Sequence, residues 1–433
     1  MNRARLLSVV SGLVCVFAAS SLLHARQSAA PAAAPAPASA PAAQNATAGR
    51  GGGPVKSPEI GADNRVTFRF RGPNAKEVGV QMSGRRLPMQ KDDAGVWSVT
   101  SDALTPDIYT YSLVVDGATM NDPANRQVQT SFGSFSSMFM MPGPQPWLPQ
   151  AGVARGAITR HAFHSAVAND DRDFFVYTPA GYDAHRDQPY PVLFLLHGLG
   201  DDAERWMNGG GGAHNILDNL IAQNKAVPMV MVTTLGYGTN TGPAGGRGPE
   251  NILGYEKILL SEVMPMVDKA YNVSRNREQR AIAGLSMGGA ESLYVGLRNL
   301  DKFAWIGAYS SAQLLWPGVA MQPAPPAPAP APADAAAGRG GRGGGPPQLI
   351  EVSSFAKVFP NLDAKANKQI KMLWIVCGTA DGLIVQNRQF KDWLKSKGVD
   401  FTEQEVPDMA HVWPLWRQNL SDMAPRLFQP KGK

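Results

Sequence analysis

The stretch Gly284-Leu285-Ser286-Met287-Gly288 brings together residue types suited to nucleophilic chemistry. Glycine supplies 45 of the 433 residues, so this Gly-x-Ser-x-Gly pattern needs support from its surroundings. Residues 278–283 predict a strand that enters the turn, and residues 288–293 predict a helix that leaves it. Such a turn presents the serine hydroxyl at a helix N-terminus, where backbone amides stabilise developing negative charge. The pattern therefore predicts Ser286 as the nucleophile of an acyl-transfer reaction.

A serine hydroxyl is a weak nucleophile unless a base removes its proton. His411 is the one histidine that follows Ser286, and hydrolases of this strand-turn-helix type have the chain order serine, acid, histidine. We therefore expect His411 to be the base. Asp381 lies in the turn after the apolar run 373–377 and is the predicted orienting acid. Asp408 competes for this role, but a carboxylate three residues before the histidine is better suited to shaping the loop.

Acyl transfer also needs two preorganised amides that stabilise the oxyanion. One should be the amide of Met287, directly after the nucleophile. The other should come from the loop 197–201 after the apolar run 192–196, and we assign it to Leu199. His197 is expected to support this loop. The glycine run 209–212 lacks the Lys-Ser/Thr of a phosphate-binding loop, and we expect a flexible turn near the mouth of the cleft.

The elements that must position these residues alternate between strand and helix from about residue 155 onward. This alternation is typical of a mostly parallel sheet, and several of the strand candidates are almost wholly apolar, as strands buried on both faces should be. We therefore expect an α/β fold of the α/β-hydrolase type over residues 154–433. The predicted strands are 174–178, 192–196, 229–233, 281–283, 305–308, 372–376 and 401–406, and the predicted helices are 252–271, 287–300, 386–397 and 415–427.

Residues 59–145 contain short runs in which apolar and polar residues alternate, as they do in β-strands. Val66, Phe68 and Phe70 alternate with polar residues, and the run 109–115 repeats this period of two. Turn sequences rich in glycine, aspartate and proline separate the runs. We expect a small all-β, immunoglobulin-like sandwich of antiparallel strands in front of the α/β domain.

Three segments have compositions unsuited to a packed core. Residues 1–26 combine Arg3 and Arg5 near the start with an apolar stretch and predict a secretory signal peptide, with a retained membrane anchor as the alternative. Residues 27–58, rich in Ala, Pro and Gly, predict a disordered linker, and residues 322–347 predict a disordered insertion within the α/β domain. The mature protein is therefore expected to be secreted or periplasmic, without stable membrane insertion.

Most of the net positive charge of the chain lies in residues 1–58, before the first predicted domain. The formal net charge is +6, but residues 1–58 hold five basic residues and no acidic ones. Taking those five from 41 leaves 36 basic against 35 acidic residues, a net charge of +1. This balance excludes a global electrostatic footprint for nucleic acid. Removal of the leader would leave Cys377 as the remaining cysteine, so no intramolecular disulfide is expected, and we interpret Cys377 as a core residue.

Together these motifs resemble the feruloyl and acetyl-xylan esterases of the carbohydrate-esterase type, whose relatives include enterochelin esterases and mycolyltransferases. The resemblance covers roughly residue 155 to the C-terminus. The residues that carry it are Tyr177-Thr178-Pro179-Ala180-Gly181-Tyr182, Leu195-Leu196-His197-Gly198-Leu199-Gly200, residues 284–289 and His411-Val412-Trp413-Pro414-Leu415-Trp416. The N-terminal module resembles the early-set, immunoglobulin-like domain often fused to such esterases, through Gly95-Val96-Trp97 and Asp122-Pro123-Ala124-Asn125 among others. We interpret Trp97 as a core residue.

The resemblance implies a serine esterase acting on feruloyl or acetyl esters of plant polysaccharide, through an acyl-serine intermediate. Trp206 and Trp413 are candidates for lining an aromatic acyl pocket. The ester substrate is the expected partner, and the mechanism calls for no metal or cofactor. Two alternatives stay open: an esterase for a siderophore or another small ester, and a non-catalytic carbohydrate-binding surface protein.

Overall fold

The computed structural model describes residues 54–322 and 349–429 of the chain. The predicted signal peptide, most of the predicted linker and almost all of the predicted insertion lie outside the described residues. Those that are described belong to one compact unit. Within them, no helix is both long and apolar enough to cross a membrane.

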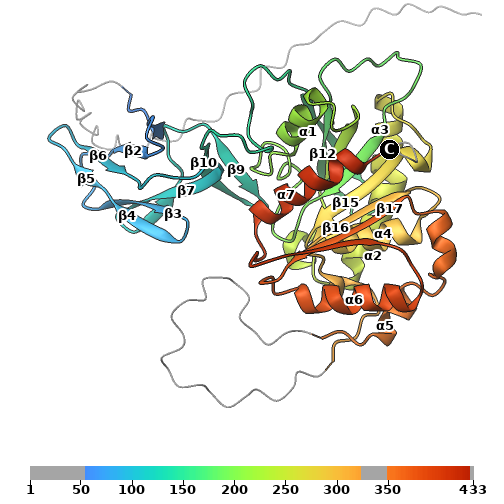
Figure 1. Cartoon of the computed structure of the whole chain (residues 1–433). Coiled ribbons are helices and arrows are strands. Elements are labelled where there is room, and N and C mark those ends of the chain that lie inside the picture. Colours follow the sequence, from blue (N-terminus) through green and yellow to red (C-terminus); the bar gives the residue numbers. More distant parts are fainter. Residues whose placement is uncertain (1–53, 323–348, 430–433) are drawn as a thin grey trace, which may run out of the picture. The chain divides into compact units, whose positions relative to one another are not determined.

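The first part of the described chain forms two antiparallel sheets (Figure 1). One sheet has the strand order β1-β2-β6-β5 and the other β4-β3-β7-β10-β9, with β8 paired to β7. The strands are β1 (Glu59–Ile60), β2 (Val66–Arg71), β3 (Val78–Met82), β4 (Arg85–Pro88), β5 (Gln90–Lys91), β6 (Val96–Thr100), β7 (Ile108–Val115), β8 (Ala118–Met120), β9 (Val128–Ser131) and β10 (Ser134–Met140).

Apolar side chains from both sheets meet in one core, so this part is a sandwich. Phe68 of β2 contacts Tyr111 of β7, with ring centroids 4.7 Å apart. Trp97 is buried, and its indole nitrogen donates a hydrogen bond to the Gly72 carbonyl over 2.9 Å. The alternating pattern therefore predicted the antiparallel sandwich correctly, and Trp97 is a core residue.

The second part is built on an eight-stranded sheet with the order β11-β12-β14-β13-β15-β16-β17-β18. The first two strands run antiparallel to their neighbours, and the pairs from β14 to β18 are parallel. The predicted α/β-hydrolase fold is confirmed in this mixed, mostly parallel sheet. The strands are β11 (Ala157–Ser165), β12 (Asp170–Thr178), β13 (Val192–Leu196), β14 (Val230–Thr234), β15 (Arg280–Leu285), β16 (Trp305–Tyr309), β17 (Met372–Gly378) and β18 (Thr402–Val406).

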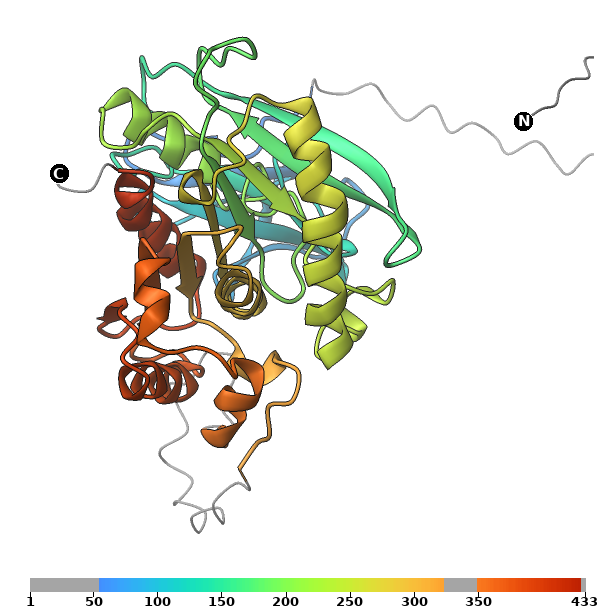
Figure 2. The ribbon, with the colours of Figure 1, turned by 90° about the vertical axis from the view of Figure 1, so that its right-hand side faces the viewer.

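Helices cover both faces of this sheet (Figures 1 and 2). Alternate residues of the central strands point into two separate cores, so that Phe194 and Ile282 lie in one core and Leu195 and Ala283 in the other. On the first face lie α2 (Pro249–Ile258), α3 (Met264–Ala270), α4 (Met287–Arg298), α5 (Ser353–Val358) and α6 (Ile384–Ser396); on the second lie α1 (Ala213–Ala222) and α7 (Trp413–Met423). Single turns of 3-10 helix occupy Gly242–Ala244, Arg277–Gln279, Gln313–Leu315, Ala364–Lys368 and Ala424–Arg426.

Two elements differ from their predicted extents. The predicted helix 252–271 consists of α2, a π-helical turn at Leu259–Val263 and α3. The strand predicted at 174–178 is the second half of β12, which pairs along its whole length with the unpredicted β11. Polar residues alternate along β11 because this strand lies at the edge of the sheet, so no continuous apolar run marked it.

Candidate active site

Ser286 lies at a sharp turn between β15 and α4. Its backbone has φ 54° and ψ −114°, a conformation that non-glycine residues rarely adopt. The turn is tight because two glycines allow close approach: a Cβ on Gly284 would lie 2.5 Å from the Gly288 carbonyl oxygen. The Ser286 amide donates to the carbonyl of Tyr309 over 2.9 Å, which ties the turn to the neighbouring strand β16. This strained turn presents the serine at the N-terminus of α4.

Asp381 and His411 meet at the ends of two other strands. Asp381 follows β17, and His411 lies between β18 and α7. The Nδ1 atom of His411 is 2.9 Å from Oδ2 of Asp381. The Asp381 side chain is fully buried, whereas the His411 side chain is 35% exposed. Asp408 instead lies on the surface, where its amide donates to the Thr379 hydroxyl, so the structure pairs His411 with Asp381.

Asp381 remains ionised in spite of its burial. Burial by itself raises the pKa of this carboxyl, but the hydrogen bond and the electrostatic attraction from the His411 ring, with smaller contributions from the Leu383 amide and the Ser310 hydroxyl, bring the pKa below its usual value. The carboxylate therefore accepts the Nδ1 proton. This arrangement leaves Nε2 of His411 as the nitrogen that can act as a base.

Ser310 and Trp416 complete the surroundings of the pair. Trp416 belongs to the motif 411–416 that carries the resemblance, whereas no sequence motif had pointed to Ser310. The Trp416 indole packs edge-on against His411 at a centroid distance of 4.8 Å. Its nitrogen donates to the Ser310 hydroxyl over 3.1 Å. Ser310 directly follows β16, the strand between those that lead to Ser286 and Asp381. It therefore links the nucleophile turn to the carboxylate.

Among the described residues, no hydrogen bond joins the Ser286 hydroxyl to His411. Catalytic hydrogen bonds in unliganded hydrolases are often long or poorly aligned and shorten when substrate binds. The turn at Ser286 is nevertheless joined to the segment that contains Ser310. The Ala312 amide, two residues beyond Ser310, donates to the Ser286 carbonyl over 3.0 Å. The three side chains follow the carboxyl ends of β15, β17 and β18 in the parallel part of one sheet, with β16 between β15 and β17.

His197 fixes the loop that faces the nucleophile turn. Its Nε2 accepts a hydrogen bond from the Gly236 amide over 2.9 Å, so the ring proton is on Nδ1, which donates to the Gly198 carbonyl over 2.8 Å. Burial lowers the pKa of His197, which keeps the ring neutral. Its carbonyl accepts from the Gly288 amide of α4 over 3.0 Å. The expected supporting role of His197 agrees with these contacts.

The amides of Leu199 and Met287 both belong to this junction. A Cβ on Gly198 would lie 3.3 Å from the Ser286 Cβ, so the loop 197–201 runs directly beside the nucleophile. Within residues 54–322 and 349–429, neither the Leu199 nor the Met287 amide donates a hydrogen bond to the protein. Two unused donors beside a serine are the arrangement that an oxyanion hole requires.

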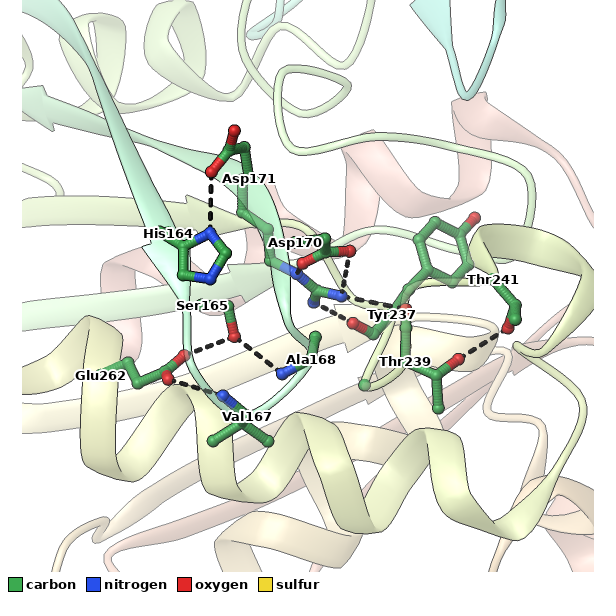
Figure 3. Close-up of polar contacts among 12 residues, drawn as sticks. His164, Ser165, Val167, Ala168, Asp170, Asp171, Tyr237, Thr239, Thr241 and Glu262 are labelled. Atoms are coloured by element: carbon green, nitrogen blue, oxygen red, sulfur yellow. Dashed lines mark hydrogen bonds and ion pairs between the residues drawn. The ribbon is translucent and has the colours of Figure 1, made fainter.

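Tyr237 supports the same loop from beneath, and the sequence had not singled it out. Its hydroxyl accepts from the Gly200 amide over 2.8 Å and donates to the Asp201 carbonyl over 3.0 Å. The backbone of Tyr237 is held in turn by the buried guanidinium of Arg172, which also donates to the Thr239 carbonyl over 2.9 Å and pairs with Asp170 (Figure 3). A buried polar network therefore fixes the conformation of the loop.

Comparison with known proteins assigns most of the α/β part of the chain to a family. Residues 165–427 match the Esterase family, described as "Putative esterase". The matched segment contains Ser286, Asp381, His411 and the loop 197–201 and covers more than half of the chain. The chain belongs to this esterase family.

The esterase is similar to proteins with related activities. It is 32% identical over 384 residues to an endo-1,4-beta-xylanase/feruloyl esterase from Xylanibacter ruminicola, covering 86% of this chain and 46% of that protein. It is 25% identical over 237 residues to an acetyl esterase from Caldicellulosiruptor saccharolyticus, covering 53% and 80% respectively. The chain thus spans about half the length of the first of these relatives.

The fold of the esterase is shared with an enterobactin esterase from Shigella flexneri. The two structures superpose with a TM-score of 0.55 at 20% identity, covering 85% of this chain and 94% of that one. The match covers a larger share of the chain than residues 165–427, the segment that matches the family. At this identity the likeness concerns the fold alone.

The two predicted pocket tryptophans have different positions in the esterase. Trp206 is fully buried, and its indole nitrogen donates to the Leu196 carbonyl over 2.9 Å, so it supports the end of β13 and offers no face to a substrate. Trp413 is half-buried and packs edge-on against Trp206 at 5.0 Å. The Arg205 guanidinium lies 4.3 Å from the Trp413 ring centre. The prediction that Trp206 contacts substrate is therefore wrong in this structure, and Trp413 stays a candidate.

The glycine run 209–212 is a packed segment rather than the flexible turn we expected. All four glycines are buried, and a Cβ on Gly211 would lie 2.6 Å from the Trp206 Cα. The Gly210 carbonyl accepts a hydrogen bond from Arg417 over 2.9 Å. These glycines are needed because the backbone approaches Trp206 closely. Over the described ranges, no group of His, Cys, Asp and Glu residues is placed to hold a metal ion.

Proposed function

We propose that this esterase is a serine carboxylic-ester hydrolase that cleaves feruloyl or acetyl esters of plant polysaccharide. The observation that carries the proposal is the buried Asp381 bonded to His411 over 2.9 Å, beside a strained turn that presents Ser286. A serine, an imidazole and a carboxylate at the carboxyl ends of strands of one sheet have the properties of a nucleophile, its base and the group that orients the base.

The chemistry follows from the positions of these groups. The Ser286 hydroxyl adds to the ester carbonyl carbon while Nε2 of His411 takes its proton, and the amides of Leu199 and Met287 stabilise the oxyanion. The bond to the alcohol breaks as His411 returns the proton to the leaving oxygen. A water molecule then adds to the acyl-serine and gives a proton to His411. The acid departs as Ser286 regains its hydrogen.

The proposed substrate class is supported by the relatives. The protein from Xylanibacter ruminicola is named as a xylanase and feruloyl esterase, and that from Caldicellulosiruptor saccharolyticus as an acetyl esterase. Plant polysaccharide lies outside the cell, which agrees with the export we propose for the leader at residues 1–26. Hydrolysis of a siderophore or another small ester is a second candidate, favoured by the fold shared with the enterobactin esterase over 85% of the chain.

The test is the Ser286→Ala variant assayed with methyl ferulate, 4-nitrophenyl acetate, feruloylated arabinoxylan, acetylxylan and enterobactin. We expect kcat on the accepted ester to fall by about 10⁴-fold or more, because no other group supplies the nucleophile. The matched control is Ser261→Ala, an exposed serine of the π-helical turn between α2 and α3, which should leave kcat unchanged.

Labelling with a fluorophosphonate separates the catalytic and non-catalytic functions. The wild-type protein should be labelled and Ser286→Ala should not. A protein that binds polysaccharide but neither reacts with the probe nor cleaves any ester would be a carbohydrate-binding protein, and the proposal would be wrong. Preference for enterobactin over both feruloyl and acetyl esters would favour the siderophore alternative.

A further inference from the structure

The hairpin β9–β10 of the N-terminal sandwich contacts the loop that carries Leu199. At its tip, the Phe132 amide donates a hydrogen bond to the Gly200 carbonyl over 3.0 Å. Two residues earlier, on β9, the Thr130 hydroxyl donates to Oδ1 of Asp202 over 2.9 Å. Two hydrogen bonds therefore join a hairpin of the sandwich to the residues on either side of Asp201.

The Phe132 side chain strengthens this junction. Its ring packs edge-on against Tyr237, with centroids 5.3 Å apart, and Tyr237 is the residue that holds the loop from beneath. A Cβ on Gly242 would lie 2.6 Å from the Phe132 ring, so the ring is also in close contact with the segment after Tyr237. Phe132 is thus placed between two loops of the α/β domain, while 45% of it remains exposed.

These contacts hold the backbone of Gly200, which would otherwise be free to rotate. Gly200 has φ +92° and no atom within 4 Å of a hypothetical Cβ, so local packing does not fix its backbone. Its amide is held by Tyr237 and its carbonyl by Phe132. Gly200 directly follows Leu199 in a loop that is anchored by hydrogen bonds at His197 and Asp201. A rotation at Gly200 would therefore have to be compensated at Leu199, which would displace the Leu199 amide. An oxyanion donor must lie about 2.7–3.1 Å from the developing oxyanion, and a misplacement of about 1 Å can lower the rate about 100-fold.

We propose that Phe132 is a positioning residue of the oxyanion hole, contributed to the catalytic site by the N-terminal sandwich. Its amide fixes the Gly200 carbonyl and its ring fixes Tyr237, and together they orient the Leu199 amide toward the oxyanion. The inference rests on the proposed function, in which Leu199 is an oxyanion donor. It assigns the sandwich a part in the chemical step itself.

Substitutions at the tip of the hairpin separate the amide from the ring. Phe132→Ala removes the ring and keeps the amide, whereas Phe132→Pro removes both. Proline is compatible with this place because Phe132 does not have a positive φ and the preceding Ser131 is the last, extended residue of β9. Phe132→Tyr retains both features and should behave as the wild type. Phe135→Ala, at a 63% exposed phenylalanine of the same hairpin, is the matched control.

The assay measures kcat and KM with 4-nitrophenyl acetate and the inhibition constant of phenylboronic acid, which forms a tetrahedral adduct on the serine. We expect Phe132→Pro to lower kcat by about 10- to 100-fold with KM within about 2-fold, and Phe132→Ala to lower kcat by less. The inhibition constant of the boronate should rise in step with the loss of kcat. Thermal unfolding of each variant shows that the protein is folded at the assay temperature.

The possible outcomes distinguish this inference from the proposed function. If Phe132→Ala and Phe132→Pro both had the kcat of the wild type, the inference would be overturned and the proposed function would stay intact. A rise in KM with unchanged kcat would also overturn it, because Phe132 would then contact substrate and not position the donor. Failure of the wild type both to cleave any ester and to react with a fluorophosphonate would overturn both.

Discussion

At the scale of single residues, Glu291 of α4 stands out as an acid buried beneath the nucleophile turn. Its side chain has no exposed surface, and Oε1 accepts a hydrogen bond from the Asn251 amide over 3.3 Å. Its second oxygen has no hydrogen-bond partner among the described residues. Burial raises the pKa of this carboxyl well above its usual value, and the bond from Asn251 only partly opposes this shift. The direction of this shift favours the protonated form of Glu291 in the folded protein.

This protonation makes the stability of the protein depend on pH. Below the unfolded pKa of 4.5, Glu291 is protonated in both states and its contribution to stability is complete. As the pH rises above 4.5, the unfolded state releases the proton while the folded state keeps it, so the free energy of unfolding falls by up to about 1.4 kcal/mol per pH unit. The loss continues until the pH passes the folded pKa.

The Glu291→Gln variant should remove this contribution. We expect its free energy of unfolding to fall less between pH 5 and pH 8 than that of the wild type, so that it is the more stable protein at the upper end of this range. Urea unfolding at several pH values measures the difference. Glu250→Gln, at an exposed residue of α2, should keep the wild-type slope. Parallel slopes for the wild type and Glu291→Gln would show that Glu291 is ionised in the folded protein.

The sequence singled out the residues to which we assign the chemistry, but not most of those that support them. Ser286, His411 and Asp381 could be predicted because chain order and strand ends restrict the choices to a few residues. Tyr237, Ser310 and Glu291 carry no such signature, since their roles arise from contacts between segments far apart in sequence. The misplacement of Trp206 has the same cause: a tryptophan near a cleft and a tryptophan beneath it look alike in sequence.

At the scale of elements, the turn between β15 and α4 depends on close approach to the end of β13. A Cβ on Gly288 would lie 2.5 Å from the His197 carbonyl oxygen and 2.6 Å from that of Leu196. Both of these contacts are backbone atoms, which cannot rotate away as a flexible side chain would. The Gly288 amide also donates to the His197 carbonyl, so the turn and the loop 197–201 share one junction.

The Gly288→Ala variant should therefore separate Ser286, the proposed nucleophile, from the proposed oxyanion donor Leu199. We expect the free energy of unfolding to fall by about 1–3 kcal/mol, the usual cost of overpacking, and kcat to fall by at least about 10-fold. Gly382→Ala is the matched control, because no atom lies within 4 Å of its hypothetical Cβ. Urea unfolding and steady-state kinetics test both effects. Wild-type kinetics in Gly288→Ala would show that the junction tolerates an additional methyl group.

The elements themselves were predictable to different degrees. Central strands such as β13 and β15 are apolar on both faces, so their position was evident from composition alone. The edge strand β11 and the π-helical turn that divides the predicted helix 252–271 were not, because edge pairing and local changes in helix type depend on neighbouring elements. The loop from Gly236 to Gly248 was also unpredictable, although it supports the oxyanion loop.

At the scale of the whole molecule, the two predicted modules share a core and an ion pair. Ile108 and Met138 of the sandwich belong to the same apolar cluster as α1 and α7. Arg417 of α7 donates to Asp107 over 2.8 Å across 310 positions of sequence. The composition of each module predicted its fold, but no local pattern could predict a contact between residues so far apart. Because α7 begins two residues after His411, this contact fixes the sandwich to the element that follows the proposed base.

Arg417 retains its charge in a buried position. Its side chain is 5% exposed, and that of Asp107 is 22% exposed. Burial lowers the pKa of Arg417 to about 10, and the charge of Asp107 opposes this shift. Asp107 accepts a second hydrogen bond from the Trp147 indole over 2.9 Å. Removal of the carboxylate would therefore leave a buried cation without its counter-charge and an indole donor without its acceptor.

We expect Asp107→Ala to lower the free energy of unfolding by about 2–4 kcal/mol, because an uncompensated buried charge costs more than the pair contributes. Replacing the arginine as well, in Asp107→Ala/Arg417→Met, should restore part of this loss by removing the charge. Glu77→Ala, which breaks the exposed pair with Arg86 in the sandwich, should cost less than about 1 kcal/mol. Urea unfolding of the four proteins measures these differences. If the double variant were less stable than Asp107→Ala, Arg417 would stabilise the interface through its remaining contacts, among them the bond to the Gly210 carbonyl, and not through its charge.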